Sequence, residues 1–167
     1  MILNNANGEK HIECMELDYF VDAYEYAMGE KLTPIAATEA PDFKCQRADG
    51  TIIGLELTKV MNSLESEDNM TGMEALDKLY ESLERKKGLA TGKIILVLQL
   101  VDCQISELKY LLDESLANDF GSYGFVEIWL ADYTGMEAYG DIELFCLYPI
   151  EHWGYYQRPY PERKPYG

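Results

Sequence analysis

Three carboxylates in one short stretch are the strongest chemical feature of this chain. Glu39 and Asp42 lie at the start, and Glu56 near the end, of the sequence of a predicted β-hairpin, whose strands run over residues 42–47 and 51–58. Carboxylate oxygens from two paired strands are the ligands that a hard divalent cation such as Mg²⁺ prefers. We therefore predict a magnesium site formed by Asp42 and Glu56, with Glu39 as a third carboxylate at its mouth.

The length of the hairpin turn decides whether two of these carboxylates meet. Side chains alternate between the two faces of a strand. A two-residue turn would point Asp42 and Glu56 to opposite faces of the sheet. A three-residue turn that ends at Gly50, with positive φ at this glycine, places Asp42 opposite Glu56 and Lys44 opposite Gly54. The metal hypothesis requires this second register, or another bulge of equal effect.

The order of these residues resembles the motif of the PD-(D/E)XK, or restriction-endonuclease-like, nuclease superfamily. A Pro-Asp pair ends at Asp42, a spacer follows, and the sequence Glu-Leu-Thr runs from Glu56 to Thr58. Thr58 stands where the motif has a lysine, so the chain resembles a divergent member. The resemblance covers residues 13–100 and implies an αβββαβ core with a C-terminal extension. It also implies that Asp42 and Glu56 hold Mg²⁺ while a lysine orients or activates the attacking water.

Two nearby lysines are candidates for the role of the missing one. Lys59 faces the other side of the sheet in the register that the metal site requires. Lys44 shares a face with Asp42, and we expect Gly54 opposite it to leave room for its side chain. Lys44 is therefore the predicted third catalytic residue beside Asp42 and Glu56.

The composition favours a different interpretation. The chain has 30 acidic and 14 basic residues and a net charge of −16, so its surface repels a phosphate backbone at long range. A solvent-facing Glu56 and a Pro-Asp strand start would also explain the motif without a metal.

Three functional classes therefore stay open. The first is a metal-dependent phosphodiesterase or nuclease, divergent or inactive because Thr58 replaces the lysine. The second is an acidic, non-catalytic protein that binds a basic protein partner, such as an immunity-type inhibitor or a DNA mimic of the anti-restriction or anti-CRISPR kind. The third is a homo-oligomeric structural protein whose 13 tyrosines partly form an interface.

The remaining pattern predicts one α/β domain over residues 1–167, with a mixed central sheet flanked by helices. Apolar side chains at helical spacing predict three helices, over residues 13–31, 72–87 and 106–118. Apolar runs predict three more strands, over residues 93–100, 125–131 and 142–148. Thr71 and Glu74 have the spacing of a capping box at the start of the second helix.

The ends of the chain and its cysteines give less information about function. Residues 1–11 are polar and predicted to be loose, and residues 61–70 read as a polar loop. Residues 150–167 form a predicted irregular aromatic tail that packs over an edge of the core, with a nucleic-acid-binding strip as the alternative. The four cysteines and two histidines lack the spacing of a zinc site. With no readable signal peptide and no apolar run long enough for a bilayer, we expect a cytoplasmic protein that does not bind membranes.

Overall fold

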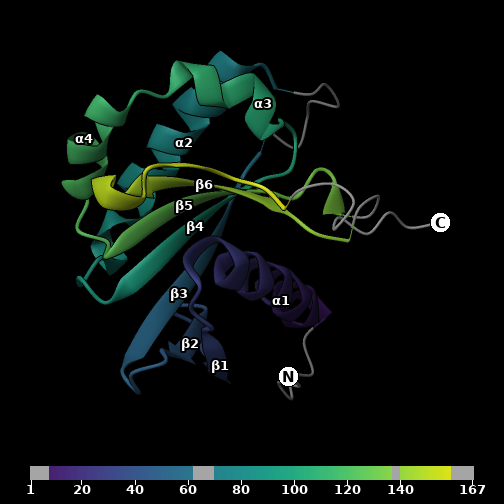
Figure 1. Ribbon diagram of the computed structural model, residues 1–167, viewed down its shortest axis with the longest axis vertical. Helices are drawn as coiled ribbons and strands as arrows, with labels where there is room; N and C mark the ends of the chain where they lie inside the picture. Colours follow the sequence, from purple (N-terminus) through teal and green to yellow (C-terminus); the bar gives the residue numbers. More distant parts are fainter. Residues whose placement is uncertain (1–7, 62–69, 137–139, 159–167) are drawn as a thin grey trace.

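Seven strands form one mixed sheet in chain order within residues 8–61, 70–136 and 140–158, which the computed structural model describes (Figure 1). The strands are β1 (Thr33–Ala37), β2 (Phe43–Gln46), β3 (Ile52–Val60), β4 (Ile94–Leu100), β5 (Glu127–Asp132), β6 (Glu143–Tyr148) and β7 (Gly154–Tyr156). Strands β3, β4 and β5 are parallel, whereas β1 and β2 on one side and β6 and β7 on the other are antiparallel to their neighbours.

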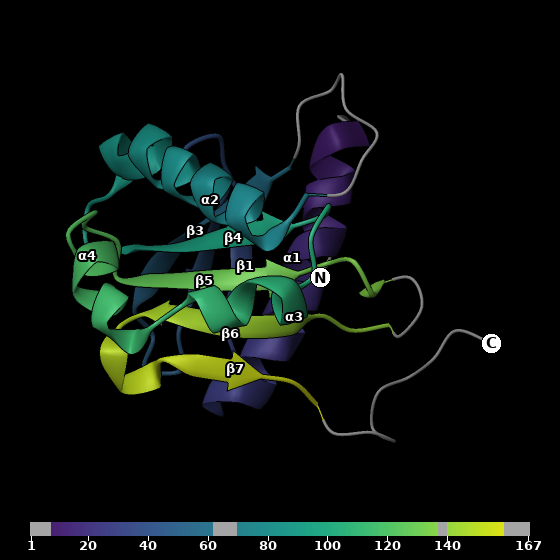
Figure 2. The same cartoon turned by 90° about the horizontal axis from the view of Figure 1, so that it is seen from above.

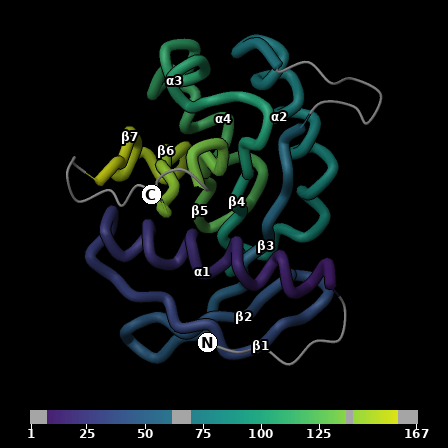
Figure 3. The backbone as a smooth tube through the Cα atoms, turned by 90° about the vertical axis from the view of Figure 1, so that its right-hand side faces the viewer, coloured from purple at the N-terminus to yellow at the C-terminus, as the bar shows by residue number. Residues whose placement is uncertain are grey.

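Helices cover both faces of this sheet. One face packs against α1 (Gly8–Met28), and the other against α2 (Gly72–Lys86), α3 (Ile105–Leu108) and α4 (Ala117–Gly121) (Figure 2). Short 3₁₀ turns connect these elements: η1 (Lys87–Leu89), η2 (Lys109–Leu111), η3 (Glu114–Leu116) and η4 (Ile150–His152). In Figure 3 the sheet bends around α1, with β1 and β2 on one side of the helix and β4 to β6 on the other. The prediction of an α/β fold with a mixed sheet is confirmed.

Strand β4 shows how the sequence produces two cores. All seven of its residues are buried. Ile95 and Val97 pack in the core under α1, and Leu96 and Leu98 pack in the core under α2. Because successive side chains point to opposite faces, a strand covered on both sides is apolar at nearly every position, and Gln99 is the one polar residue of β4. The predicted central position of this strand is therefore confirmed.

The first elements follow each other as helix, three strands, helix and strand. The sequence pattern alone did not predict β1, which is short, contains Pro34 and lies at the edge of the sheet, where a proline is tolerated. The other edge strand, β7, falls in the tail that was expected to be irregular. Residues 8–11, expected to be loose, form the first turn of α1.

The prediction of a continuous helix over residues 106–118 is wrong. Leu112 and Asp113 adopt extended backbone conformations that separate η2 from η3 and α4. Asp113 Oδ1 accepts a hydrogen bond from Ser115 N at 2.9 Å, so this side chain competes with the helical backbone pattern.

The capping box predicted at the start of α2 is confirmed, since Thr71 Oγ1 accepts from Glu74 N and Glu74 Oε1 accepts from Thr71 N.

A buried carboxylate fixes the hairpin to the rest of the fold. Glu127 on β5 accepts hydrogen bonds from Trp129 Nε1 at 2.8 Å, Tyr24 Oη at 3.0 Å and Arg47 Nη2 at 2.9 Å. Arg47 follows β2 directly and also forms an ion pair with Glu30 at 2.7 Å. The hairpin is therefore held against α1 and β5 by charge-assisted hydrogen bonds.

Most of the predicted polar loop at residues 61–70 lies outside the described residues, as do residues 1–7 and 159–167. In the described part of the chain, no helix has the length and apolar character needed to cross a membrane.

Candidate functional site

The hairpin turn has the three-residue form that the metal hypothesis requires. Gly50 has a φ of +90°. Arg47 N donates to Thr51 O at 2.8 Å, and Gly50 N donates to Arg47 O at 3.0 Å. The strand register that follows sets Asp42 opposite Glu56. The predicted register is confirmed, and it follows from the ease with which glycine adopts positive φ.

The two opposed residues bind each other's strands. Glu56 Oε1 accepts a hydrogen bond from Asp42 N at 3.0 Å, and Asp42 Oδ2 accepts one from Leu57 N at 2.8 Å. Asp42 lies just before the first residue of β2, so the two carboxylates extend the hydrogen bonding between β2 and β3 beyond the strand with side-chain oxygens. Glu56 is only 3% exposed, so its charge needs partners inside the protein.

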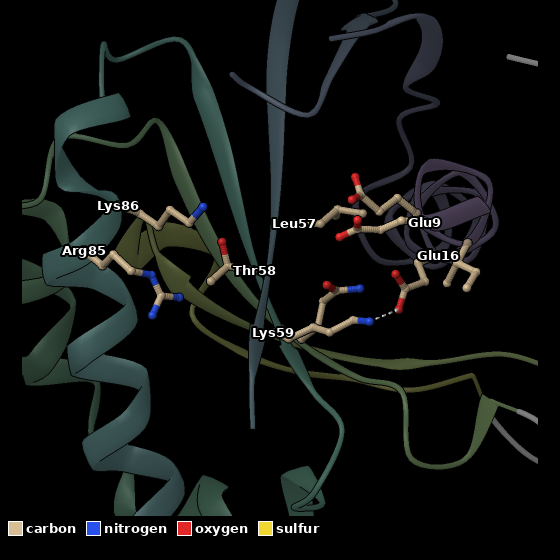
Figure 4. A pocket seen from close by; sticks show the side chains of 10 residues that line it. Glu9, Glu16, Leu57, Thr58, Lys59, Arg85 and Lys86 are labelled. Carbon is tan, nitrogen blue, oxygen red and sulfur yellow. Dashed lines mark ion pairs between the residues drawn. The ribbon is translucent and has the colours of Figure 1, made fainter. Parts of the chain in front are cut away.

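Two lysines provide positive charge at this pair. Lys86 Nζ, from the last turn of α2, lies 2.7 Å from Glu56 Oε2. Lys10 Nζ, from α1, lies 3.7 Å from Asp42 Oδ1 and donates to the Asp42 carbonyl oxygen at 3.2 Å. In Figure 4, Lys86 and Thr58 lie on the same side of β3. Lys86 is therefore the lysine that pairs with Glu56 among the described residues, and it comes from another element than the hairpin.

Lys86 was not identified as a site residue from the sequence. The available signal was the run of three basic residues from Arg85 to Lys87, which was interpreted only as favourable charge at a helix C-terminus.

Asp42 titrates close to neutral pH. Burial, the largest cause, and the negative charges of Glu56 and Glu13 together raise the pKa of this carboxyl to about 6. The hydrogen bond from Leu57 N and the Lys10 ammonium oppose the shift. Negative charge is therefore crowded around Asp42.

A pocket of about 320 Å³ lies beside this pair, between α1 and α2. It follows the edge of β3 beyond the last residue that pairs with β2. Its lining combines residues of α1, which include three acids, two bases from α2, and residues of strands β3 and β4: Glu9, Ile12, Glu13, Glu16, Leu57, Thr58, Lys59, Arg85, Lys86 and Gln99 (Figure 4). The pocket is therefore polar and charged on both sides of β3.

Three buried polar atoms in this pocket lack hydrogen-bond partners in the described part of the chain: Glu16 Oε1, Thr58 Oγ1 and Gln99 Nε2. Each belongs to a residue that is at least 94% buried, because the exposed fractions are 6%, 4% and 1%. Buried polar groups in native proteins are nearly always satisfied, and an unsatisfied one costs about 1–3 kcal/mol. All three line one pocket, so a polar molecule bound there would be able to satisfy them.

The structure places the other two predicted site residues nearby but outside this pair. Glu39 is exposed and lines a neighbouring hollow of about 440 Å³ together with Asp42 and Glu13. Lys44 lines a different hollow, opposite Gly54. The expectation that Gly54 leaves room for Lys44 is wrong, because Pro41 fills the space: a Cβ on Gly54 would lie 2.7 Å from Pro41 Cγ.

The donor atoms of the pair fit a hard cation. Among the described residues, no group of three or more His, Cys, Asp or Glu side chains is arranged to hold a metal ion. Mg²⁺ does not need such a set, because it commonly binds one or two protein carboxylates and completes its octahedron with water and substrate phosphate oxygens. Asp42 and Glu56 supply oxygen donors alone, and a cation there would offset both the burial and the neighbouring negative charges that raise the Asp42 pKa.

Comparisons with known proteins do not extend this description. No protein-family model, no curated protein and no solved structure matches the chain. Its function must therefore be inferred from the residues of the site.

Proposed function

We propose that this protein is a metal-dependent phosphodiesterase of the PD-(D/E)XK type, with Asp42, Glu56 and Lys86 in its active site. The observation that carries the proposal is the direct opposition of Asp42 and Glu56 at the end of β2, with Lys86 Nζ 2.7 Å from Glu56. The order helix, three strands, helix and strand at the start of the chain also supports it, because the nuclease core has that order.

Asp42 and Glu56 would hold Mg²⁺ through the remaining lone pairs of their carboxylate oxygens, because Glu56 Oε1, Glu56 Oε2 and Asp42 Oδ2 each already accept one hydrogen bond. When bound, the ion would polarise a phosphoryl oxygen and lower the pKa of a coordinated water. Asp42 is mostly ionised at pH 7 because its pKa is about 6. Below pH 6 the same carboxyl takes up a proton and loses affinity for a cation. Activity should therefore fall in acid.

Lys86 takes the role that the motif gives to a lysine on β3. Its ammonium supplies positive charge where negative charge develops on a phosphoryl group during hydrolysis. Thr58 Oγ1 lies in the same pocket, is buried and has no hydrogen-bond partner among the described residues. This hydroxyl is available to donate to, or accept from, a water molecule. The threonine thus leaves space and a polar group where a lysine of the motif would stand.

The proposal is tested by metal binding and by hydrolysis of a small phosphodiester, bis(p-nitrophenyl) phosphate, which needs no extended binding surface. Mg²⁺ or Mn²⁺ should raise the melting temperature, because a ligand that binds only the native state stabilises it. Asp42→Asn and Glu56→Gln should each abolish this shift and lower the hydrolysis rate by about 10²-fold or more. Glu84→Gln is the matched control, since Glu84 is exposed and forms its ion pair with Lys87, away from the site.

A second candidate function is the acidic, non-catalytic binding protein. It is favoured by one observation: both site carboxylates already have backbone and lysine partners within the chain, so the pair is satisfied without a metal. In that case metals leave the melting temperature unchanged, no phosphodiester is cleaved, and a basic protein binds with strong salt dependence. That combination of results would overturn the phosphodiesterase proposal.

A further inference from the structure

The charges around the site are divided between its two sides. Acids from α1 and the β1–β2 loop, Glu9, Glu13 and Glu39, line the hollows on one side. Three cations have no carboxylate partner among the described residues: Arg85, which lies across β3 from Glu9 in Figure 4, and Lys44 and Lys93, which line a separate hollow. In a chain with a net charge of −16, unpaired cations on one side of a site indicate the direction from which an anion approaches.

Two of these cations border a hollow of about 460 Å³ next to the catalytic pair. Lys44 and Lys93 line this hollow, and its lining is otherwise mostly apolar: Ala40, Pro41, Ile52, Gly54, Gly88, Leu89, Thr91 and Ile94. Pro41 directly precedes Asp42, and Gly54 is two residues from Glu56 on β3. The volume is within the range of about 300–1,000 Å³ that is typical of small-molecule sites.

We propose that this hollow binds an unpaired nucleotide of a single-stranded nucleic acid, with the base on the apolar floor and the flanking phosphates on Lys44 and Lys93. This inference rests on the proposed phosphodiesterase function and names its substrate. Apolar side chains such as Pro41, Ile52 and Ile94 provide a nonpolar surface against which an unstacked base can pack. The lysines provide compact charges for phosphates. The neighbouring phosphodiester would then lie toward Asp42, because Pro41, which lines the hollow, directly precedes Asp42.

A double helix fits this surface less well. A duplex carries phosphates on two strands, and its bases are stacked and cannot enter a hollow without being flipped out. One strand of a duplex centred on the site would also face the acids Glu9, Glu13 and Glu39. A single strand can approach over the cationic side alone, which avoids this repulsion.

The test measures binding without cleavage. Fluorescence anisotropy of labelled dT₁₂, U₁₂ and a 12-base-pair duplex is recorded in EDTA with the full chain at several salt concentrations. We expect both single strands to bind more tightly than the duplex, by about tenfold or more. The Lys44→Ala/Lys93→Ala variant should lose most of this affinity, and the slope of log affinity against log salt should decrease in magnitude by about 1.4, since each phosphate contact contributes about 0.7 for single strands.

Matched variants separate a local site from a general charge effect. Lys31→Ala/Lys78→Ala removes the same charge elsewhere on the surface and should change the affinity less than twofold. Ile52→Asp places a negative charge in the hollow and should abolish binding, whereas Ile35→Asp should not, because both isoleucines are 47% exposed but only Ile52 lines the hollow. Equal losses in target and control variants, or tighter duplex binding, would overturn the inference.

The failure of this inference is distinguishable from failure of the proposed function. If metal-dependent hydrolysis of bis(p-nitrophenyl) phosphate depends on Asp42 but no oligonucleotide binds, the phosphodiesterase stands and the nucleotide site is wrong. If only U₁₂ or only dT₁₂ binds, the site is kept and the sugar it accepts is identified. If neither hydrolysis nor oligonucleotide binding occurs, both proposals fail.

Discussion

Asp42 and Glu56 each accept a hydrogen bond from the other's strand: Glu56 Oε1 from Asp42 N at 3.0 Å, and Asp42 Oδ2 from Leu57 N at 2.8 Å. Each residue therefore has a structural role in addition to any catalytic one, because the carboxylates extend the pairing of two strands past the end of β2. Conservative substitutions that keep an oxygen acceptor, such as Asp42→Asn, are for this reason better probes of catalysis than alanine.

Lys86→Ala should separate catalysis from metal binding. The variant removes the ammonium next to Glu56, so hydrolysis should fall by about 10²-fold or more while Mg²⁺ binding is kept or strengthened, because a competing cation has gone. Lys87→Ala is the control, since Lys87 is exposed and pairs with Glu84. Calorimetric titration with Mg²⁺ and the hydrolysis assay check both parts. Similar rates for the two variants would exclude a catalytic role for Lys86.

The stability of the metal-free protein should depend on pH through Asp42. Its pKa of about 6 in the folded state lies above the value of 3.8 that the unfolded chain has, so the native state binds this proton more tightly. The ionised form therefore costs stability above pH 6, and the cost disappears as the pH falls toward 4. Relative to Asp42→Asn, the wild-type protein should gain about 1–3 kcal/mol in free energy of unfolding between pH 7 and pH 4.

Urea unfolding in EDTA at several pH values measures this difference. With Mg²⁺ present the trend should reverse, because protonation of Asp42 then displaces a stabilising ion. Parallel pH profiles of wild type and Asp42→Asn in EDTA would show that Asp42 has an ordinary pKa.

Gly54→Ala should damage both the fold and the site. The new Cβ would lie 2.7 Å from Pro41 Cγ and 3.2 Å from Ile94 Cγ1, so Pro41 and the adjoining Asp42 must move. Overpacking of this kind costs about 1–3 kcal/mol, and Mg²⁺ affinity should fall with it. Gly88→Ala is the control, because no heavy atom lies within 4 Å of its Cβ position. Thermal unfolding and Mg²⁺ titration of both variants test this, and equal stability of the two would contradict it.

Arg47→Ala should destabilise the protein more than the loss of a surface ion pair would. Arg47 is a charged partner of the buried Glu127 carboxylate, and removing it leaves an uncompensated charge, at a cost of about 3–5 kcal/mol. Glu30→Gln removes only the more exposed partner of the same arginine and should cost less than about 1 kcal/mol. Denaturant unfolding of the two variants measures the difference. A small effect of both would indicate that Tyr24 and Trp129 alone satisfy Glu127.

The opposition of Asp42 and Glu56 was predictable because it depends on local geometry. Gly50 selects the turn, the turn sets the register, and alternation along the strands then fixes which side chains meet. The central strand β4 was predictable for a similar reason, since burial on both faces favours the nearly continuous apolar run that this strand has.

Lys86 was not predictable because its position depends on tertiary packing. The apolar spacing of α2 indicates which face is buried, but the place where its last turn meets β3 depends on how the whole helix lies on the sheet. The break at Leu112 and Asp113 was missed because the apolar spacing continues through it, while a local side-chain hydrogen bond determines the backbone.

The early end of β2 has a consequence for amide hydrogen exchange along β3. Gly54 N donates toward β4, and Glu56 and Thr58 have the same orientation, so their amides are inside the sheet. Lys59 N points the other way, toward an edge where β2 provides no partner. Neighbouring amides of one strand should therefore exchange at very different rates, slow at Thr58 and fast at Lys59. A molecule bound along this edge would slow exchange at Lys59 while leaving Thr58 unchanged, so the contrast between the two amides reports directly on occupancy of the pocket.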